Sequence, residues 1–272
     1  MTKVPVIVSF GEILFDVIDG EPHLGGAPLN LAVQLRRQGA DASIISSVGR
    51  DRLGDAVFTA LDSYGMSTEY VRRSEYPTGR VTVTLDEAKV PCYEFLNDCA
   101  YDHIETDYAG SPDLFCYGTL AQRSEGSRST LRRLWDSLKT TFFYDVNLRQ
   151  NFYSKELIRD SLLHADIVKI NDEEFRVLCD LFDLPPEPAA MAERFGLEVL
   201  ILTLGPDGCQ VCSKGQMVHS PAVPVKVVST VGSGDAFSAA FLFHYWKGED
   251  LRACADAGNA LAAKVAGQPG AI

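Results

Sequence analysis

Short apolar runs alternate along the chain with stretches whose apolar residues recur at helical spacing. Residues 4–12 (VPVIVSFGE) are rich in Val and Ile, which is typical of a strand buried on both faces. Residues 28–38 have the spacing of an amphipathic helix, residues 41–49 form a second strand-like run, and residues 52–65 form a second amphipathic helix. This order of strand, helix, strand and helix predicts parallel βαβ units.

The same alternation resumes in the second half of the chain. Further strands are expected at 113–119, 140–148, 165–171, 198–205 and 209–214, and helices at 127–139, 154–164, 172–182 and 187–196. Residues 224–248 predict a strand, then a Gly-rich turn and a helix, and residues 250–266 an Ala-rich helix. We therefore predict an α/β fold with a doubly wound, mostly parallel sheet that is flanked by helices.

Two segments interrupt this rhythm. Residues 78–97 alternate apolar and polar positions on both sides of a turn near residues 86–89, which predicts a hairpin. Residues 12–25 form a short and partly polar pair of strands. Because both segments are more polar than a central parallel strand, we expect them to leave the main sheet and form a small second layer.

Composition and charge narrow the classes of protein. With 272 residues, the chain is expected to form one domain, and its 25 basic and 37 acidic side chains give a net charge of −12. An acidic chain argues against a nucleic-acid or polybasic membrane-surface partner. No apolar run approaches ~20 residues, and no layout of a signal peptide is present. The seven scattered cysteines, including the Cys209–Cys212 pair, are therefore expected to be reduced thiols in a cytoplasmic protein.

The strongest chemical signal is TVGSGDAF at residues 230–237. Gly232, Ser233 and Gly234 would expose backbone N–H groups at the start of a helix, where anions such as phosphate bind. Asp235 next to these amides could accept a proton from an attacking hydroxyl, or it could simply cap the helix.

Other polar groups fall at expected strand ends and turns. Asn171 and Glu174 are spaced either for a Mg²⁺ site or for a capping box, and the two can hold together. Asp16 and Asn30 suit sugar hydroxyls, although both also fit turn positions, and Gly25–Gly26 would let a ring approach the backbone. Asn147 and Arg149 follow a strand whose carboxyl end would face a ligand crevice, and a surface salt bridge is the alternative for the arginine. The isolated histidines are expected to be surface residues, although His23 in the segment 12–25 could contact a sugar.

Three motifs together resemble one family. GGAPLN at 25–30, NDEE at 171–174 and TVGSGDAF at 230–237 occur in the order of the ribokinase-like, or phosphofructokinase-B, carbohydrate kinases. The resemblance covers almost the whole chain, and the segments GEILFDVI, PTGRVTVTLDE and YDVNLR are most similar to bacterial fructokinases.

The resemblance implies one kinase domain over residues 1–272, with a β lid formed by residues 12–25 and 78–97. It implies ATP-dependent phosphorylation of a sugar hydroxyl, with fructose as the expected acceptor, Asp235 as catalytic base and Gly232 and Gly234 in the anion hole. It also implies that the lid closes over the sugar and forms a homodimer contact. It further implies that Asp16, Gly26 and Asn30 bind the sugar. Asn171 and Glu174 would organise Mg²⁺ and the nucleotide phosphates through water. Nucleotide contacts would come from Thr203, Gly205 and Asn259.

The chain also departs from the family pattern. Ser229 stands where many relatives carry Asp beside a monovalent-cation site, which weakens the case for K⁺ activation. Ala27 and Pro28 replace the Lys and Gly of some relatives, which favours a neutral sugar, although Arg80 or Arg149 could supply charge. The alternatives are a kinase for 2-keto-3-deoxygluconate, ribose or a nucleoside, or a catalytically weak regulator that binds sugar or nucleotide.

Overall fold

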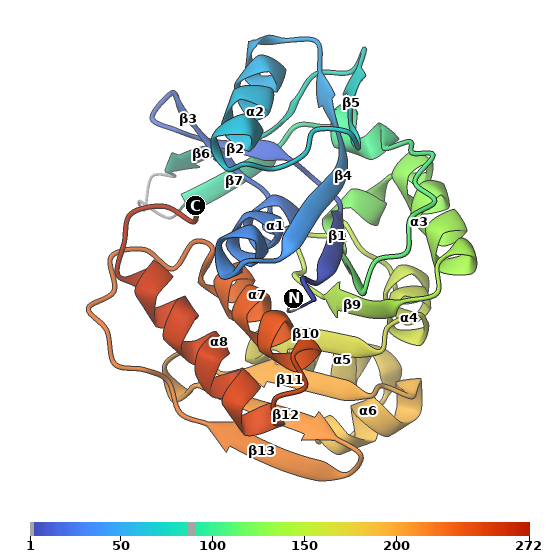
Figure 1. Cartoon of the computed structure of the whole chain (residues 1–272), viewed down its shortest axis with the longest axis vertical. Coiled ribbons are helices and arrows are strands. Elements are labelled where there is room, and N and C mark those ends of the chain that lie inside the picture. The colour runs from blue at the N-terminus through green and yellow to red at the C-terminus, as the bar shows by residue number, and fades with distance from the viewer. Residues whose placement is uncertain (1–2, 86–90) are drawn as a thin grey trace.

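The computed structural model describes residues 3–85 and 91–272, and a nine-stranded sheet forms its centre (Figure 1). The strand order is β13-β12-β11-β10-β9-β8-β1-β4-β5, and all neighbours from β11 to β5 are parallel. β12 and β13 extend one edge as antiparallel strands. The bounds are β1 Val6–Phe10, β4 Asp41–Gly49, β5 Val71–Ser74, β8 Leu114–Gly118, β9 Thr141–Asp145, β10 Ile167–Asn171, β11 Val199–Thr203, β12 Cys209–Ser213 and β13 Gln216–Ser220.

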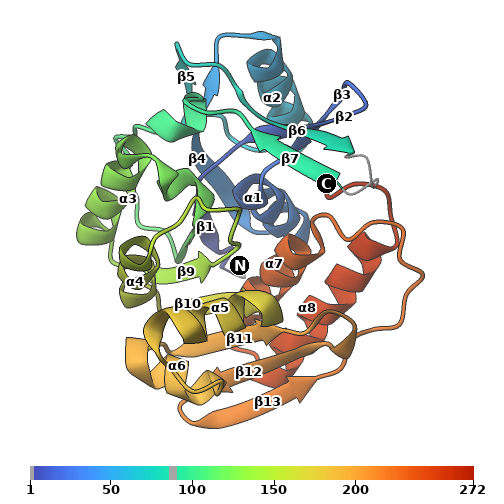
Figure 2. The same cartoon turned by 180° about the vertical axis from the view of Figure 1, so that it is seen from behind.

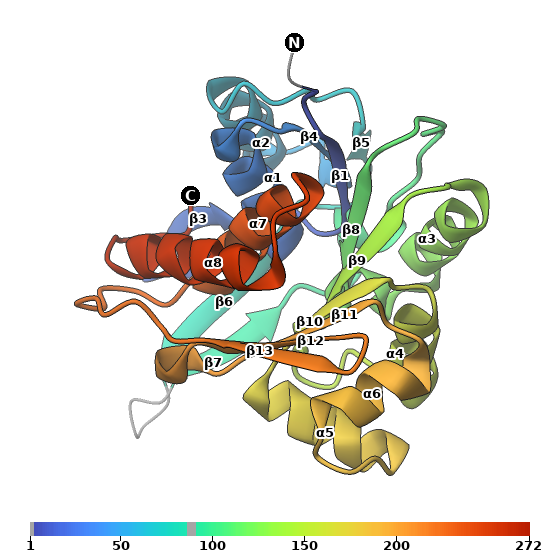
Figure 3. The same ribbon diagram turned by 60° about the horizontal axis from the view of Figure 1, so that its bottom comes forward.

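Helices cover both faces of this sheet. One face carries α1, α2, α7 and α8, and the opposite face, seen in Figure 2, carries α3 to α6. Figure 3 shows the two helical layers on either side of β10 to β13. The bounds are α1 Ala27–Gln38, α2 Arg52–Ser63, α3 Glu125–Ser137, α4 Lys155–Leu163, α5 Asp172–Phe182, α6 Pro188–Phe195, α7 Ser233–Trp246 and α8 Leu251–Ala266, with short 3₁₀ turns at Ala100–His103, Leu120–Arg123 and Gly205–Asp207.

Burial on both faces explains the continuous apolar run of β1. Ile7 packs in the cluster beneath α1 and α7, whereas Val8 and Phe10 belong to the cluster on the other side of the sheet. All three side chains are about 1% exposed. A strand covered on both faces needs apolar residues at odd and even positions, which is the pattern that the sequence shows.

A second, four-stranded sheet stands apart from the first. Its order is β3-β2-β6-β7, with β2 (Leu14–Ile18) parallel to β6 (Gly79–Leu85) and the other two pairs antiparallel. β3 covers Glu21–Gly25 and β7 covers Pro91–Phe95. These strands fall in the two segments that interrupt the sequence pattern, while the turn expected near residues 86–89 lies outside the described residues.

One predicted strand is wrong. Residues 224–229 lie in a loop without strand structure, where the Val228 and Ser229 N–H groups both donate to the Ala266 carbonyl. Three of its valines, Val225, Val227 and Val228, are exposed. The apolar run lacks a neighbouring strand to pair with, so its composition alone does not produce a strand.

The sheet topology locates a crevice. The chain passes from β1 through the small sheet and α1 to β4 on one side of β1, and it later places β8 on the other side. Strand order therefore reverses at β1, and ligands of open α/β sheets bind at such a reversal, beyond the carboxyl ends of the strands.

Candidate active site

The loop that precedes α7 presents free amides towards the crevice. Gly232 is the N-cap of α7 with φ of 77°, a left-handed conformation that glycine adopts without strain. The first α-helical bond runs from the Ala236 N–H to the Gly232 carbonyl, and the Ser233 N–H bonds Thr230. The amides of Gly234 and Asp235 precede that helical bond, so they can receive an anion at the positive end of the helix dipole.

Asp235 is half-buried and does not cap α7 with its side chain. Gly232, the N-cap, receives no side-chain cap, and Asp235 Oδ2 instead accepts a hydrogen bond from Asn30 Nδ2 at 2.8 Å. Burial and the neighbouring Asp145 carboxylate raise the pKa of Asp235 to about 6, although Lys169 and the Asn30 hydrogen bond act in the opposite direction. A carboxylate with a raised pKa beside helix amides is arranged as a general base.

A buried ion pair lies beneath this carboxylate. Lys169 of β10 is 8% exposed, and its Nζ lies 3.0 and 3.1 Å from the two carboxylate oxygens of Asp145, at the end of β9. A methyl group added at Gly234 would lie 3.1 Å from Lys169 Nζ, so the ammonium sits directly under the glycine loop. Asp145 and Glu174 raise the pKa of Lys169 against the effect of burial, so the ammonium stays charged. The sequence patterns did not identify Lys169 as a site residue. The signal that could have identified it is a lysine within the otherwise apolar run ADIVKIN.

The residues predicted to bind sugar gather on the other side of Asp235. Asn30 lies in the first turn of α1, and Asp16 on β2 points towards Gly25, where an added Cβ would lie 3.2 Å from Asp16 Oδ2. Gly26 has φ of 112° and packs on the backbone of the loop after β1. The exposed Arg149 lowers the pKa of both Asp16 and Asp235, whereas burial raises each. The fold therefore brings Asp16, Asn30, Arg149 and Asp235 to one place.

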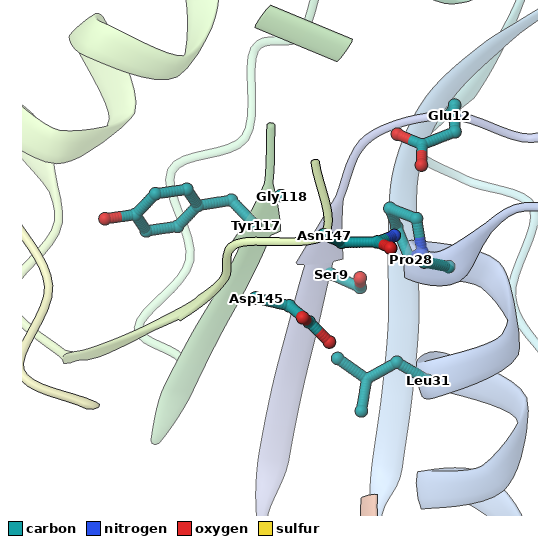
Figure 4. A pocket seen from close by; sticks show the side chains of 9 residues that line it. Ser9, Glu12, Pro28, Leu31, Tyr117, Gly118, Asp145 and Asn147 are labelled. Atoms are coloured by element: carbon teal, nitrogen blue, oxygen red, sulfur yellow. The ribbon is translucent and has the colours of Figure 1, made fainter. Parts of the chain in front are cut away.

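A pocket opens at the ends of β1, β8 and β9 (Figure 4). Asn147 adopts φ of 39°, an uncommon conformation for a residue other than glycine, and its side chain points across the pocket towards Pro28. Glu12, two residues after the end of β1, also lines the pocket, and the sequence patterns did not identify it as a site residue. The lining residues are Ser9, Glu12, Ala27, Pro28, Leu31, Tyr117, Gly118, Asp145 and Asn147.

Asn171 and Glu174 form the capping box of α5. Asn171 Oδ1 accepts from the Glu174 N–H at 2.8 Å, and Glu174 Oε2 accepts from the Asn171 N–H at 3.0 Å. Glu174 Oε1 accepts from the Leu148 N–H at 2.9 Å, which ties α5 to the loop after β9. Each of these oxygens has a lone pair left for water, so the pair suits a hydrated Mg²⁺ ion that it would touch only through water.

The other residues expected near the nucleotide lie at the neighbouring strand end. Thr203 closes β11 opposite Asn171, and Gly205 begins a 3₁₀ turn with φ of 56°. Asn259 on α8 is buried, and its Nδ2 donates to the carbonyls of Ser220 and Pro221 and to the Ser220 hydroxyl. The Asn259 amide thus holds the chain that follows β13.

Several other features of the described residues bear on the predicted chemistry. The Ser229 hydroxyl accepts from the Val231 N–H at 3.2 Å. Cys209 and Cys212 are buried free thiols on β12. Over residues 3–85 and 91–272, no group of three His, Cys, Asp or Glu side chains is placed to hold a metal, and no helix is both long and apolar enough to cross a bilayer.

Comparison with known proteins agrees with this geometry. The model of the pfkB family carbohydrate kinases matches residues 6–272. A putative sugar kinase of Pyrococcus horikoshii is 31% identical over 267 residues, covering 87% of this chain and 81% of that protein. The fructokinase of Klebsiella pneumoniae is 30% identical over 252 residues, with 85% and 81% covered.

Solved structures agree as well. The Pyrococcus horikoshii kinase in complex with ATP has a TM-score of 0.85 at 29% identity, covering 98% of this chain and 94% of that one. The fructokinase of Vibrio cholerae O395 with fructose, ADP and calcium has a TM-score of 0.85 at 20% identity, covering 97% and 94%, which supports the fold. The predicted resemblance and fold class are confirmed: the chain belongs to the pfkB family of carbohydrate kinases and is an ATP-dependent sugar kinase.

Proposed function

We propose that this sugar kinase is a fructokinase, in which residues 1–272 act as one kinase domain whose small sheet closes as a lid over the sugar. The observation that carries the site assignment is the Asp235–Asn30 contact of 2.8 Å at the start of α7. It places a half-buried carboxylate between free helix amides on one side and polar groups suited to sugar hydroxyls on the other. The fructokinases of Klebsiella pneumoniae and Escherichia coli, at 30% and 28% identity, support fructose as the acceptor.

In the proposed reaction, Asp16 and Asn30 hold sugar hydroxyls while Asp235 accepts the proton of the attacking primary hydroxyl. The freed oxygen attacks the γ-phosphorus of ATP as the bond to ADP breaks in line. The Gly234 and Asp235 amides, with Arg149, stabilise the negative charge of the transferring group. A carboxylate whose pKa is raised to about 6 is still mostly ionised at neutral pH, and it is a stronger base than an ordinary aspartate.

ATP and Mg²⁺ are the proposed cofactors. Mg²⁺ retains most of its water and is commonly bound by few carboxylates together with substrate phosphates, which fits Asn171 and Glu174 as water-mediated partners. When bound, the ion neutralises phosphate charge. Thr203, Gly205 and the α8 segment around Asn259 would flank the nucleotide, and we propose no role for K⁺.

We also propose that the lid pairs two copies of the chain. Ile18, Val83 and Tyr93 form one row across β2, β6 and β7, and Ile18 and Tyr93 are 44% and 53% exposed. An exposed apolar row on a small sheet is suited to a symmetric contact. Light scattering on the wild type and on Tyr93→Ser would detect the dimer and its weakening.

The decisive test of the activity is ADP formation with a panel of acceptors: fructose, ribose, a nucleoside, 2-keto-3-deoxygluconate and fructose 6-phosphate. We expect the largest kcat/KM with fructose. Preference for the acid or the phosphorylated sugar would contradict the fructokinase proposal. Sugar-dependent thermal stabilisation without any ADP would instead indicate a binding regulator.

A further inference from the structure

Glu12 is a buried carboxyl group that the proposed reaction does not use. It lies two residues after the end of β1, it is 3% exposed, and it lines the pocket of Figure 4. Its Oε2 atom is buried without a hydrogen-bond partner among the described residues. A polar atom buried in this way costs free energy in the unliganded protein, so it marks a place where a ligand can supply the missing partner.

The backbone around Glu12 is closely packed. Gly26 packs on it so closely that an added Cβ would lie 2.5 Å from the Glu12 carbonyl oxygen. A Cβ at Gly11 would lie 2.5 Å from Cγ of Pro28. The loop after β1 and the start of α1 are therefore tightly packed, which fixes the backbone position of Glu12.

Charged groups of both signs lie around Glu12. Arg149, Asp235 and Arg123 are the charged groups whose fields act on Glu12, and Arg149 also acts on Asp16 and Asp235. Arg123 is already committed, because its Nε and Nη2 donate to the two oxygens of Asp102 at 2.7 Å.

Arg149 has no carboxylate partner within ion-pair distance in the described part of the chain. One available cation thus faces the three carboxyl groups of Glu12, Asp16 and Asp235. A ligand that binds between these side chains is therefore exposed to more negative than positive charge.

We propose that Glu12 is a specificity-determining residue, which contacts a hydroxyl of the acceptor and selects neutral polyhydroxylated sugars against anionic ones. This inference rests on the proposed function and deepens it. A sugar hydroxyl can donate to the open Oε2 atom and satisfy it. A carboxylate or a phosphate cannot donate, and it would add like charge to a site that already contains too much.

The protonation behaviour of Glu12 supports this choice. Burial raises its pKa to about 7, so the carboxyl group can donate as well as accept near neutral pH. A hydroxyl can hydrogen-bond to either form, whereas a carboxylate or phosphate group placed against Glu12 is compatible only with the protonated form.

The test compares Glu12→Gln with the wild type in kcat/KM for fructose and for 2-keto-3-deoxygluconate. The glutamine keeps the shape and removes the charge. We expect the fructose value to fall about tenfold or more, and the ratio of fructose to acid to fall by at least as much. Glu193→Gln, which removes an exposed carboxylate from α6, is the matched control and should leave the ratio within twofold.

Two further measurements keep the test decisive. Glu12→Asp retains the charge, so kcat/KM for fructose should fall while the preference for the neutral sugar persists. This variant also tests the proposal if Glu12→Gln does not fold. Calorimetric titration with each sugar measures the difference in binding affinity between them without catalytic turnover.

The outcomes separate the two proposals. A wild type without ADP formation on any acceptor contradicts the proposed function, and the titrations still decide the role of Glu12. A wild type that prefers the acid, or a Glu12→Gln ratio unchanged within twofold, overturns the inference even when fructose is phosphorylated.

Discussion

The two sides of the crevice differ in how their polar groups are satisfied. On the nucleotide side, Asn171, Glu174 and Asn259 bond backbone groups of the protein itself. On the acceptor side, Glu12 Oε2, Asn30 Oδ1 and Ser9 Oγ are buried without partners among the described residues. Groups of the first kind build the scaffold, whereas groups of the second kind remain available for a ligand.

Because of this difference, the NDEE and GGAPLN motifs have different roles in the protein. The NDEE segment has a structural function that the bonds of its capping box already explain, and any metal contact is added through water. In the GGAPLN segment, by contrast, the side-chain amide of Asn30 donates to Asp235. Its Oδ1 atom has no hydrogen-bond partner among the described residues. Substitutions should therefore change mainly stability on the nucleotide side and mainly sugar use on the acceptor side.

The largest effect is expected for Asp235→Asn, which removes the base and keeps the shape. We expect kcat to fall by about 10²–10⁴, because positioned general bases contribute rate factors of that order. Fructose affinity should stay within threefold, since the Asn30 contact can be kept. A kcat within threefold of the wild type would show that another group accepts the proton.

Lys169→Met is expected to have the next largest effect, on stability. The change leaves Asp145 buried and unpaired, so the free energy of unfolding should fall by about 3–5 kcal/mol. Adding Asp145→Asn should recover most of that loss, because no buried charge then remains uncompensated. Urea unfolding of the single and double variants measures both values, and equal stability of the two would contradict the ion-pair account.

A smaller effect concerns pH. Asp235 can accept a proton only when it is ionised, so kcat should fall about tenfold per unit as the pH drops below about 6. Lys169 lowers the pKa of Asp235 and Asp145 raises it, so Lys169→Met should move this acid limb to higher pH. A limb that does not move would mean that it reports a different group.

Sequence patterns predicted most of the parallel core, because strands buried on both faces have continuous apolar runs and the helices between them have clear caps. The strand predicted at 224–229 was wrong because a strand also needs a neighbouring strand to pair with, and composition does not reveal one. Glu12 and Lys169 were missed for a related reason: their meaning depends on which strand ends meet. Asp235 and Asn30 were found because short glycine motifs mark them, although their contact across 205 positions needed the fold.

The most direct measurement is a matched pair of Asn→Ala substitutions, one on each side of the crevice. Titration of fructose and thermal unfolding are measured for Asn30→Ala and Asn259→Ala. We predict that Asn30→Ala loses about tenfold or more in affinity with little change in Tm, whereas Asn259→Ala lowers Tm and keeps the affinity. The reverse pattern, or equal effects of both substitutions, would contradict the division between ligand-binding and scaffold groups.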